Sequence, residues 1–343
     1  MSRFALTALA LVCVVSLAGC PSSASNSNST STEAKSGQPT FAFVTNCVAD
    51  FWTVAEKGVE KAKQDLGVNA VVVMPNGDAV DQKNKVEDLI ARGVDGIAIS
   101  PKDPTNQGDM LKAISENALF ITHDSDAPNS PRLCYIGMDN YQAGRLCGEL
   151  IKEAKPDGAQ ICLFIGNIDQ DNSKKRRQGL IDELLDRPAD PVRFDPAVGV
   201  IKNDKYTILD TRTDNHDSAK AKELVQDAMS KYPEMDLVVG LFEYNPPILL
   251  DAVKGANRLK EITVVAFDEN AQVLQGIKDG EVFGTVVQNP YDYGYKSIEL
   301  LNEIYKGNKS AIPESGMIDI PARKITKGNV DEFWTDLKAK IGK

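Results

Sequence analysis

Apolar and polar residues alternate along the chain in a way that predicts strands and helices in turn. Short apolar runs at 40–45, 70–74 and 96–100 are typical of buried strands. Between them, segments such as 52–66 and 81–92 carry apolar residues near helical spacing. Strands that alternate with helices of about 10–15 residues indicate parallel sheets covered by helices on both faces, an α/β fold.

The same succession restarts after residue 140 and continues to about residue 305, which predicts two doubly wound parallel-sheet lobes. Polar segments at 139–140 and 288–290 mark places where the chain would cross between lobes, so we expect a multi-crossing hinge. Residues 186–216 interrupt the pattern and predict a surface excursion beside a short strand at 206–209. We assign residues 40–138 with 289–317 to the first lobe and 139–288 with 318–338 to the second.

The first twenty residues have the pattern of an export signal. Arg3 provides a positive charge, residues 4–18 are apolar, and Leu-Ala-Gly-Cys follows at 17–20. Small residues ending on a cysteine resemble a bacterial lipoprotein signal, which implies a signal peptide at 1–19 and a lipid on Cys20. A plain secretory signal is the alternative. The Ser-rich segment 20–39 is interpreted as a flexible tether.

Composition narrows the classes of function. The formal net charge of −10 argues against nucleic acid or an anionic membrane surface as a partner. No later apolar run reaches the roughly 20 residues that a membrane span needs. Four cysteines follow the tether, all in apolar stretches and none in a CxxC pair. We expect buried thiols, with two disulfides as the alternative, at Cys47, Cys134, Cys147 and Cys162.

Side chains that suit a neutral sugar follow the predicted strand ends. Sugar hydroxyls both donate and accept, so carboxylates, amides and guanidinium groups can bind several at once. The C–H face of a sugar ring packs on an aromatic plane. The candidate ligand-binding residues are Phe51, Trp52, Asp124, Arg176, His216, Asn245, Asp268 and Gln288.

A series of segments, in order along residues 40–320, resembles the ribose-binding family of periplasmic solute-binding proteins, which has the type I fold. The matching segments are residues 44–67 with Phe51-Trp52 opening a helix, 97–101, 121–124, Asp139-Asn140, Arg176 followed by Gly179, 264–268 and 285–288. The resemblance implies a ligand held between Phe51 and Trp52. It also implies hydrogen bonds from Asp124, Arg176, Asp268 and Gln288.

The resemblance further implies an exported receptor, in the periplasm or cell envelope, that delivers a pentose, hexose or related polyol to an ABC permease. We expect a monomer with no cofactor and no metal. The chain departs from the ribose binders at Ala49-Asp50 and Ser125. It has His216 where they have an aromatic residue and Phe242 where they have Asn, so ribose itself is not implied.

Each candidate residue also has a structural alternative. Phe51 or Trp52 could belong to the core, and Asp124 and Asp268 could cap helices. Arg176 could lie on a solvated helix face, which is the interpretation we favour for Arg177.

Other ambiguous residues lie near the hinge and in a loop. His216 could lie in a surface loop or at a metal, although metal-ligand spacing is absent. Asp139 and Asn140 could connect the hinge rather than touch a ligand.

Three other functions compete with sugar reception. The same fold could bind a nucleoside or a furanosyl signal molecule. A glycosidase could use Asp124 and Asp268 as its paired carboxylates, although no hydrolase motif is present. A sugar-responsive repressor would need a DNA-binding segment before residue 41, where the signal and tether lie.

Overall fold

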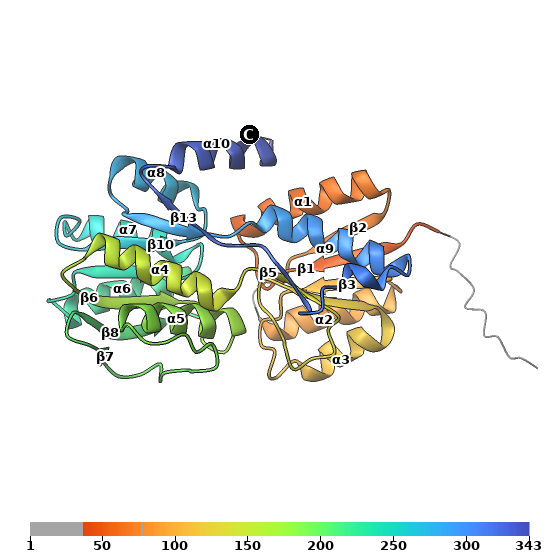
Figure 1. Ribbon diagram of the computed structural model, residues 1–343, viewed down its shortest axis with the longest axis horizontal. Coiled ribbons are helices and arrows are strands. Elements are labelled where there is room, and N and C mark those ends of the chain that lie inside the picture. The colour runs from red at the N-terminus through yellow and green to blue at the C-terminus, as the bar shows by residue number, and fades with distance from the viewer. Residues whose placement is uncertain (1–36, 77, 343) are drawn as a thin grey trace, which may run out of the picture. The chain divides into compact units, whose positions relative to one another are not determined.

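The computed structural model describes residues 37–76 and 78–342, and residues 38–343 form one compact unit (Figure 1). The predicted signal peptide, Cys20 and nearly all of the tether lie outside the described residues. Within the described part, no helix is both long enough and apolar enough to cross a membrane.

Two sheets form the centres of two lobes. The first sheet has the order β12-β5-β4-β3-β1-β2, and all its neighbours are parallel. Its strands are β1 (Thr40–Val44), β2 (Asn69–Val73), β3 (Gly96–Ile99), β4 (Leu119–His123), β5 (Tyr135–Gly137) and β12 (Met317–Asp319).

The second sheet has the order β13-β11-β10-β9-β6-β8-β7. Its central strands are parallel, and the edge strands β7 and β13 are antiparallel to their neighbours. Its strands are β6 (Ala159–Ile165), β7 (Ile201–Lys202), β8 (Tyr206–Thr213), β9 (Leu237–Gly240), β10 (Thr263–Phe267), β11 (Gly284–Val287) and β13 (Arg323–Thr326). The predicted α/β class with two doubly wound lobes is therefore confirmed.

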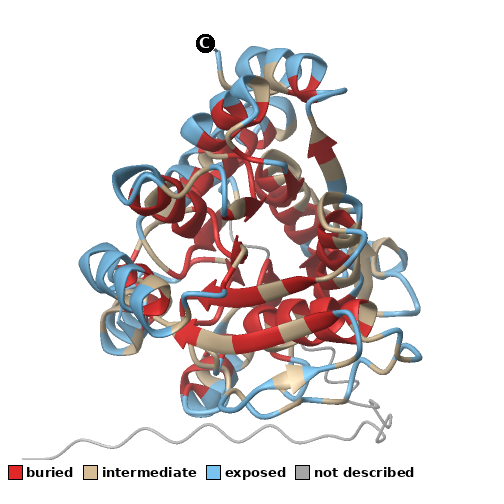
Figure 2. Ribbon diagram, turned by 90° about the vertical axis from the view of Figure 1, so that its left-hand side faces the viewer, coloured by how far each residue is buried: buried red, intermediate tan, exposed pale blue. Residues whose placement is uncertain are grey.

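Helices cover both sheets, and buried residues line the faces between helices and strands (Figure 2). The first lobe contains α1 (Asp50–Leu66), α2 (Ala79–Ala91), α3 (Gly108–Asn117) and α9 (Pro290–Tyr305). The second contains α4 (Asn140–Ala154), α5 (Asp171–Leu184), α6 (Ser218–Lys231), α7 (Asn245–Gly255), α8 (Ala271–Asp279) and α10 (Val330–Ile341). A short 3-10 helix, η1 (Lys309–Ala311), follows α9.

One pair of helices in each lobe is in very close contact, α1 with α9 and α4 with α5. Glycine makes the second approach possible. A Cβ atom on Gly144 of α4 would overlap the carbonyl oxygen of Arg176, and one on Gly179 of α5 would overlap that of Tyr141. Because backbone touches backbone here, the position of Arg176 on α5 is fixed relative to α4.

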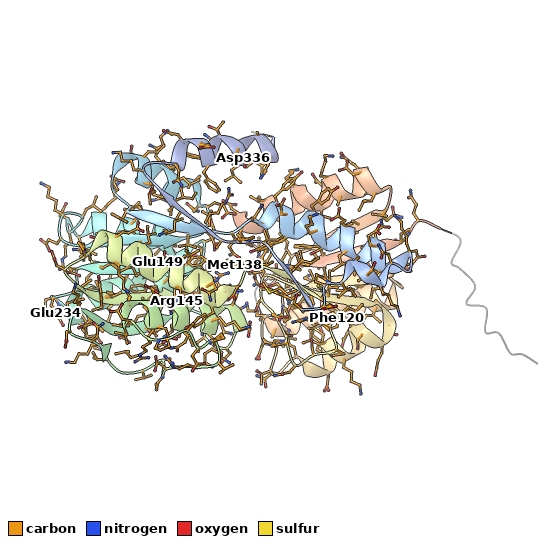
Figure 3. The ribbon with its side chains drawn as sticks, in the orientation of Figure 1. Phe120, Met138, Arg145, Glu149, Glu234 and Asp336 are labelled. Atoms are coloured by element: carbon orange, nitrogen blue, oxygen red, sulfur yellow. The ribbon has the colours of Figure 1, made fainter. Side chains whose placement is uncertain are left out.

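The chain passes between the lobes three times. It crosses after β5, where Met138 is labelled in Figure 3, and again between β11 and α9. Both crossings fall where the sequence predicts them. The third crossing lies at 320–322, because β12 pairs with β5 in the first sheet. The predicted boundary after residue 317 is therefore too early.

The region 186–216 also differs in detail from the prediction. The strand beside the excursion, β8, runs over Tyr206–Thr213 and is longer than the four residues predicted. Its pairing with β6 continues to Thr213, which brings the following loop to the same sheet edge as the end of β6.

Candidate functional site

The carboxyl ends of the parallel strands of both lobes surround one narrow cavity of about 40 Å³. Seven of the eight predicted ligand-binding residues line it, and Asn245 does not. The lining residues are Asn46, Cys47, Ala49, Phe51, Trp52, Asp124, Arg176, His216, Phe242, Glu243, Tyr244, Asp268 and Gln288.

Arg176 lies at the centre of the site with no exposed surface. Its Nη2 atom lies 3.5 Å from Asp124 Oδ1 of the first lobe, and its Nη1 atom lies 3.9 Å from Asp268 Oδ2 of the second. The guanidinium also lies 5.4 Å from the ring centre of Phe242 and 4.6 Å from that of Phe267. One buried cation therefore faces two carboxylates, and the alternative of a solvated helix face is wrong for Arg176.

The hinge helps to orient this guanidinium. Arg176 Nε donates to Asn140 Oδ1 at 2.8 Å, and Asn140 Nδ2 donates to the carbonyl oxygen of Asp124 at 3.1 Å. Asp139 caps α4 by accepting from the backbone N–H groups of Tyr141 and Gln142. The Asp139-Asn140 crossing therefore connects the hinge directly to the central cation.

Asp124 follows β4 and receives hydrogen bonds from both lobes. Its Oδ2 atom accepts from Ser100 Oγ at 2.9 Å and from Asn46 Nδ2 at 3.4 Å. Asn172 Nδ2, on α5 of the second lobe, donates to the same oxygen at 3.4 Å. Burial raises the pKa of Asp124, and the charge of Arg176 opposes that rise. The first helix after this residue is capped by Asp139, so Asp124 is not a helix cap.

Asp268 follows β10 in the second lobe and is held by a chain of polar groups. Gln288 Nε2 donates to its Oδ1 atom at 2.7 Å, and Tyr293 Oη donates to Gln288 Oε1 at 3.1 Å. Burial raises the pKa of Asp268 to about 7, while Arg176 acts in the opposite direction. The next helix, α8, is capped by Asn270, so the cap alternative is wrong here too.

Aromatic side chains form part of the first-lobe wall. Phe51 and Trp52 meet edge to face, with ring centres 4.8 Å apart. Trp52 Nε1 donates to Asn46 Oδ1 at 3.2 Å. Both rings are buried and belong to the same hydrophobic cluster as Phe41 and Phe43 of β1. They are therefore part of the first-lobe core and of the cavity wall at once.

The second-lobe wall has three rings, and the sequence indicates two of them, His216 and Phe242. The His216 ring lies 5.5 Å from Phe242 and 5.8 Å from Tyr244 between centres. Burial lowers the pKa of His216 to about 4, so its imidazole is neutral near pH 7. Asp214 accepts from Tyr244 Oη and, at 2.8 Å, from Asn245 Nδ2. Asn245 thus holds the loop after β8 through Asp214 and does not face the cavity.

Five lining residues that carry polar or aromatic groups are not among the eight predicted ones. Asn46 and Cys47 follow β1, and Phe242, Glu243 and Tyr244 follow β9. They lie in segments directly after strands, but the sequence did not indicate which residue of each segment faces the cavity.

Arg177 corrects a further expectation. It was expected on a solvated face, but only 3% of it is exposed. Its Nε atom donates to Thr211 Oγ1 at 2.9 Å, and its Nη atoms donate to the carbonyl oxygens of Asp195 and Pro196 at 2.8 and 2.7 Å. The excursion after α5 covers this side of the helix, so Arg177 anchors that loop.

The cysteines within residues 37–76 and 78–342 are free thiols. Cys134, Cys147 and Cys162 are buried, as expected. Cys47 is half-buried at the cavity, and desolvation raises its pKa to about 11. In the same range, no group of three or more His, Cys, Asp or Glu side chains could hold a metal ion.

Comparisons with known proteins agree with this architecture. The family model described as "Periplasmic binding protein domain" matches residues 41–309. The "Ribose import binding protein RbsB" of Salmonella typhimurium is 24% identical over 262 residues, which cover 76% of this chain and 82% of that protein. The protein of the same name from Bacillus subtilis is 25% identical over 76% of this chain and 79% of its own length.

Solved structures show the same fold. An ABC transporter solute-binding protein from Burkholderia graminis, in complex with D-arabinose, superposes with a TM-score of 0.75 at 26% identity, over 85% of this chain and 96% of its own. GanP, a glucose-galactose binding protein from Geobacillus stearothermophilus, superposes with a TM-score of 0.76 at 22% identity, over 85% of this chain and 99% of its own. The family model covers most of the chain, and the two-sheet architecture agrees with these structures; this chain therefore belongs to the periplasmic binding protein family and has its type I fold.

Proposed function

We propose that this chain is a lipid-anchored extracytoplasmic receptor that binds a pentose, hexose or related polyol and delivers it to an ABC importer. The observation that carries the proposal is the Asp124–Arg176–Asp268 group. It places a buried cation between carboxylates of two lobes, at a cavity with aromatic walls.

The chemistry of this group suits a polyol. Asp124 and Asp268 can accept from hydroxyl groups, and Arg176 can donate to hydroxyl oxygens. The rings of Phe51 and Trp52 on one side, and of His216 and Phe242 on the other, provide apolar surfaces for the C–H faces of a sugar ring. The names of the relatives, which mention ribose import and complexes with D-arabinose, support the same class of ligand.

The connection between the lobes supports delivery by closure. Arg176 and Asn172 on α5 of the second lobe reach Asp124 of the first. A ligand that binds both walls stabilises the closed arrangement, because it has less affinity for an arrangement in which the walls are apart. The importer would recognise that closed form, and no chemical change of the ligand is part of the proposal.

A screen by thermal denaturation tests this function. Pentoses, hexoses, polyols and nucleosides are added singly, and we expect one group of sugars to raise the melting temperature. A ligand at 100 times its Kd adds about 2.7 kcal/mol to the free energy of unfolding. The added sugar should be recovered unaltered, and X-ray scattering should give a smaller radius of gyration with ligand. Hydrolysis of a glycoside, or stabilisation by nucleosides alone, would contradict the proposal.

The anchor is tested separately by fractionation of cells that express the full chain. Cys20→Ser should move the protein from the membrane fraction to the soluble fraction, since a cleaved, unlipidated N-terminus has no membrane affinity of its own. Cys47→Ser is the matched control and should leave the protein in the membrane fraction. Equal fractionation of wild type and Cys20→Ser would exclude a lipid at this position.

A further inference from the structure

A buried tyrosine behind the cavity connects two of the crossings between the lobes. Tyr293 lies in the first turn of α9 and has no exposed surface. The backbone N–H of Met138, in the first crossing, donates to its hydroxyl oxygen at 3.2 Å. The hydroxyl itself donates to Gln288 Oε1, in the second crossing, at 3.1 Å. One side-chain oxygen therefore joins two hinge segments that are far apart in the sequence.

These hydrogen bonds set the orientation of a side chain in the cavity wall. A tyrosine hydroxyl has one hydrogen to donate, and that of Tyr293 is directed to the amide oxygen of Gln288. The NH₂ group of Gln288 therefore faces Asp268 and donates to its Oδ1 atom at 2.7 Å. A reversed amide would place one acceptor against another. Gln288 and Asp268 line the cavity, whereas Tyr293 is not among the described residues that line it.

The three crossings are joined to one another in pairs. The first and third are joined by the backbone N–H of Ile320, which donates to the carbonyl oxygen of Gly137 at 2.9 Å. The second and third adjoin the paired strands β11 and β13, in which Val287 is opposite Arg323. The first and second are joined through the hydroxyl of Tyr293. Unlike the two backbone connections, this one depends on a single side-chain group that a substitution can remove.

Removal of the hydroxyl would leave two buried polar groups without this partner, the N–H of Met138 and the amide oxygen of Gln288. A buried donor or acceptor that loses its partner is costly, because water does not replace it. The ring of Tyr293 lies 6.4 Å from that of Phe51, between centres, and this packing does not need the hydroxyl. Phenylalanine at position 293 would therefore remove the hydrogen bonds and keep the apolar contacts.

We propose that Tyr293 is a positioning residue of the sugar site, which couples closure of the hinge to the alignment of Gln288 with Asp268. This inference rests on the proposed sugar-binding function and adds a connection by which the hinge controls the site. When the lobes separate, the chain changes direction at 138–139 and 288–289, where it passes between them. The hydroxyl keeps both hydrogen bonds only while the two crossings have their closed arrangement. The wall of Gln288 and Asp268 is therefore complete only when the hinge is closed.

Substitution by phenylalanine tests the coupling, and a second buried tyrosine is the matched control. Tyr293→Phe should weaken sugar binding by about tenfold, the size of one hydrogen bond. Tyr141 is also buried, and its hydroxyl accepts from the N–H of Asp190 at 2.9 Å and donates to Asp182 Oδ2 at 2.8 Å. Tyr141→Phe should lower the melting temperature at least as much, because its acceptor is charged, and leave sugar affinity within about twofold.

A double-mutant cycle determines whether Tyr293 acts through Gln288. Gln288→Met removes the amide and should itself weaken binding. In that background Tyr293→Phe should change the affinity by less than about twofold further, because the group that it positions is absent.

Stopped-flow measurements test the connection with closure. The loss in Tyr293→Phe should appear as a dissociation rate about tenfold faster, with an association rate within about twofold of wild type, because the hydrogen bonds form on closure after the sugar has entered. A tyrosine that only shaped the open cleft would change the association rate instead.

Four results would overturn the coupling while leaving sugar binding intact. Tyr293→Phe could bind sugar as tightly as wild type, or its loss could lie in the association rate. Tyr141→Phe could lose as much affinity, which would indicate a general effect of stability. The effects of Tyr293→Phe and Gln288→Met could be additive, which would show that Tyr293 does not act through Gln288. If the wild type binds no sugar, the proposed function itself fails, and the coupling fails with it.

Discussion

Asp124 and Asp268 occupy equivalent places in the two lobes, yet their surroundings differ. Each directly follows a strand, β4 or β10, and each has a positive φ, 55° and 69° respectively. Both carboxylates face the same guanidinium of Arg176. A doubly wound lobe therefore delivers one carboxylate to the cleft in each half of the molecule.

The difference lies in the neighbours. Asp124 accepts from a hydroxyl and two amides besides facing Arg176, whereas Asp268 accepts from Gln288 and is close to other acids. Burial raises the pKa of both, and the charges of Asp124 and Glu243 raise that of Asp268 further, to about 7. The comparison teaches that topology positions the carboxylates, while local donors decide how readily each is ionised.

The largest effect on binding is expected from removing the cation that both carboxylates share. Arg176→Ala should weaken sugar binding by about 100-fold or more, because charge-assisted hydrogen bonds to the ligand are lost. It should also lower the free energy of unfolding by about 3–5 kcal/mol, since two buried carboxylates lose their counter-charge. Calorimetry and urea denaturation measure the two effects. Arg92→Ala, at an exposed arginine, is the control, and equal results for both variants would contradict the central role of Arg176.

A pH series separates the two carboxylates. The folded-state pKa of Asp268, about 7, lies above its unfolded value of 3.8. Its contribution to stability is therefore complete below about pH 4 and is lost as the pH rises through 7. The free energy of unfolding of the wild type should fall between pH 5 and pH 8. Asp268→Asn should flatten that fall more than Asp124→Asn does.

Both asparagine variants should weaken sugar binding by about 10- to 100-fold at pH 7. Glu243 and Glu269, whose pKa values burial also raises, remain in both variants, so the difference between the two slopes reports the aspartates. If the slopes of the two variants coincide, the surroundings of Asp124 and Asp268 are not as different as the contacts indicate.

The smallest effect on binding is expected at Arg177, next to the central cation in sequence. Arg177→Ala should change sugar affinity less than about twofold, because its donors point to the loop after α5 and not to the cavity. It should lower the free energy of unfolding by about 2–3 kcal/mol, since buried acceptors on that loop lose their partner. Urea denaturation with and without sugar checks both statements. A large loss of affinity would mean that the loop controls the cleft.

Much of the fold follows from patterns that are local in sequence. The strand β1 and the helix α1 can be recognised directly in the sequence. A buried strand is a short, continuous apolar run, and a helix that covers a sheet has apolar residues at helical spacing. The three-residue strand β5 was not predicted, and β12 was expected only as a further strand after the last helix, without bounds. They have too few residues to show a period, and they pair across a long stretch of chain.

The site shows the same division. Positions directly after strands identified Asp124 and Asp268, since strand ends of a parallel sheet share one edge. Which residue of the segment 242–245 faces the cavity could not be read, because α7 begins at Asn245 and turns that side chain toward Asp214. Likewise, the spacing of apolar residues within α5 does not indicate that the loop after this helix covers Arg177.

The third crossing has a consequence for the order of synthesis. The first lobe needs α9 against α1 and β12 against β5, and both late elements lie beyond residue 289. A ribosome has therefore made nearly the whole chain before the lobe that emerges first can complete its sheet. This arrangement delays the formation of a finished first lobe until the last segment has been released, which would keep the chain unfolded during passage through a membrane channel.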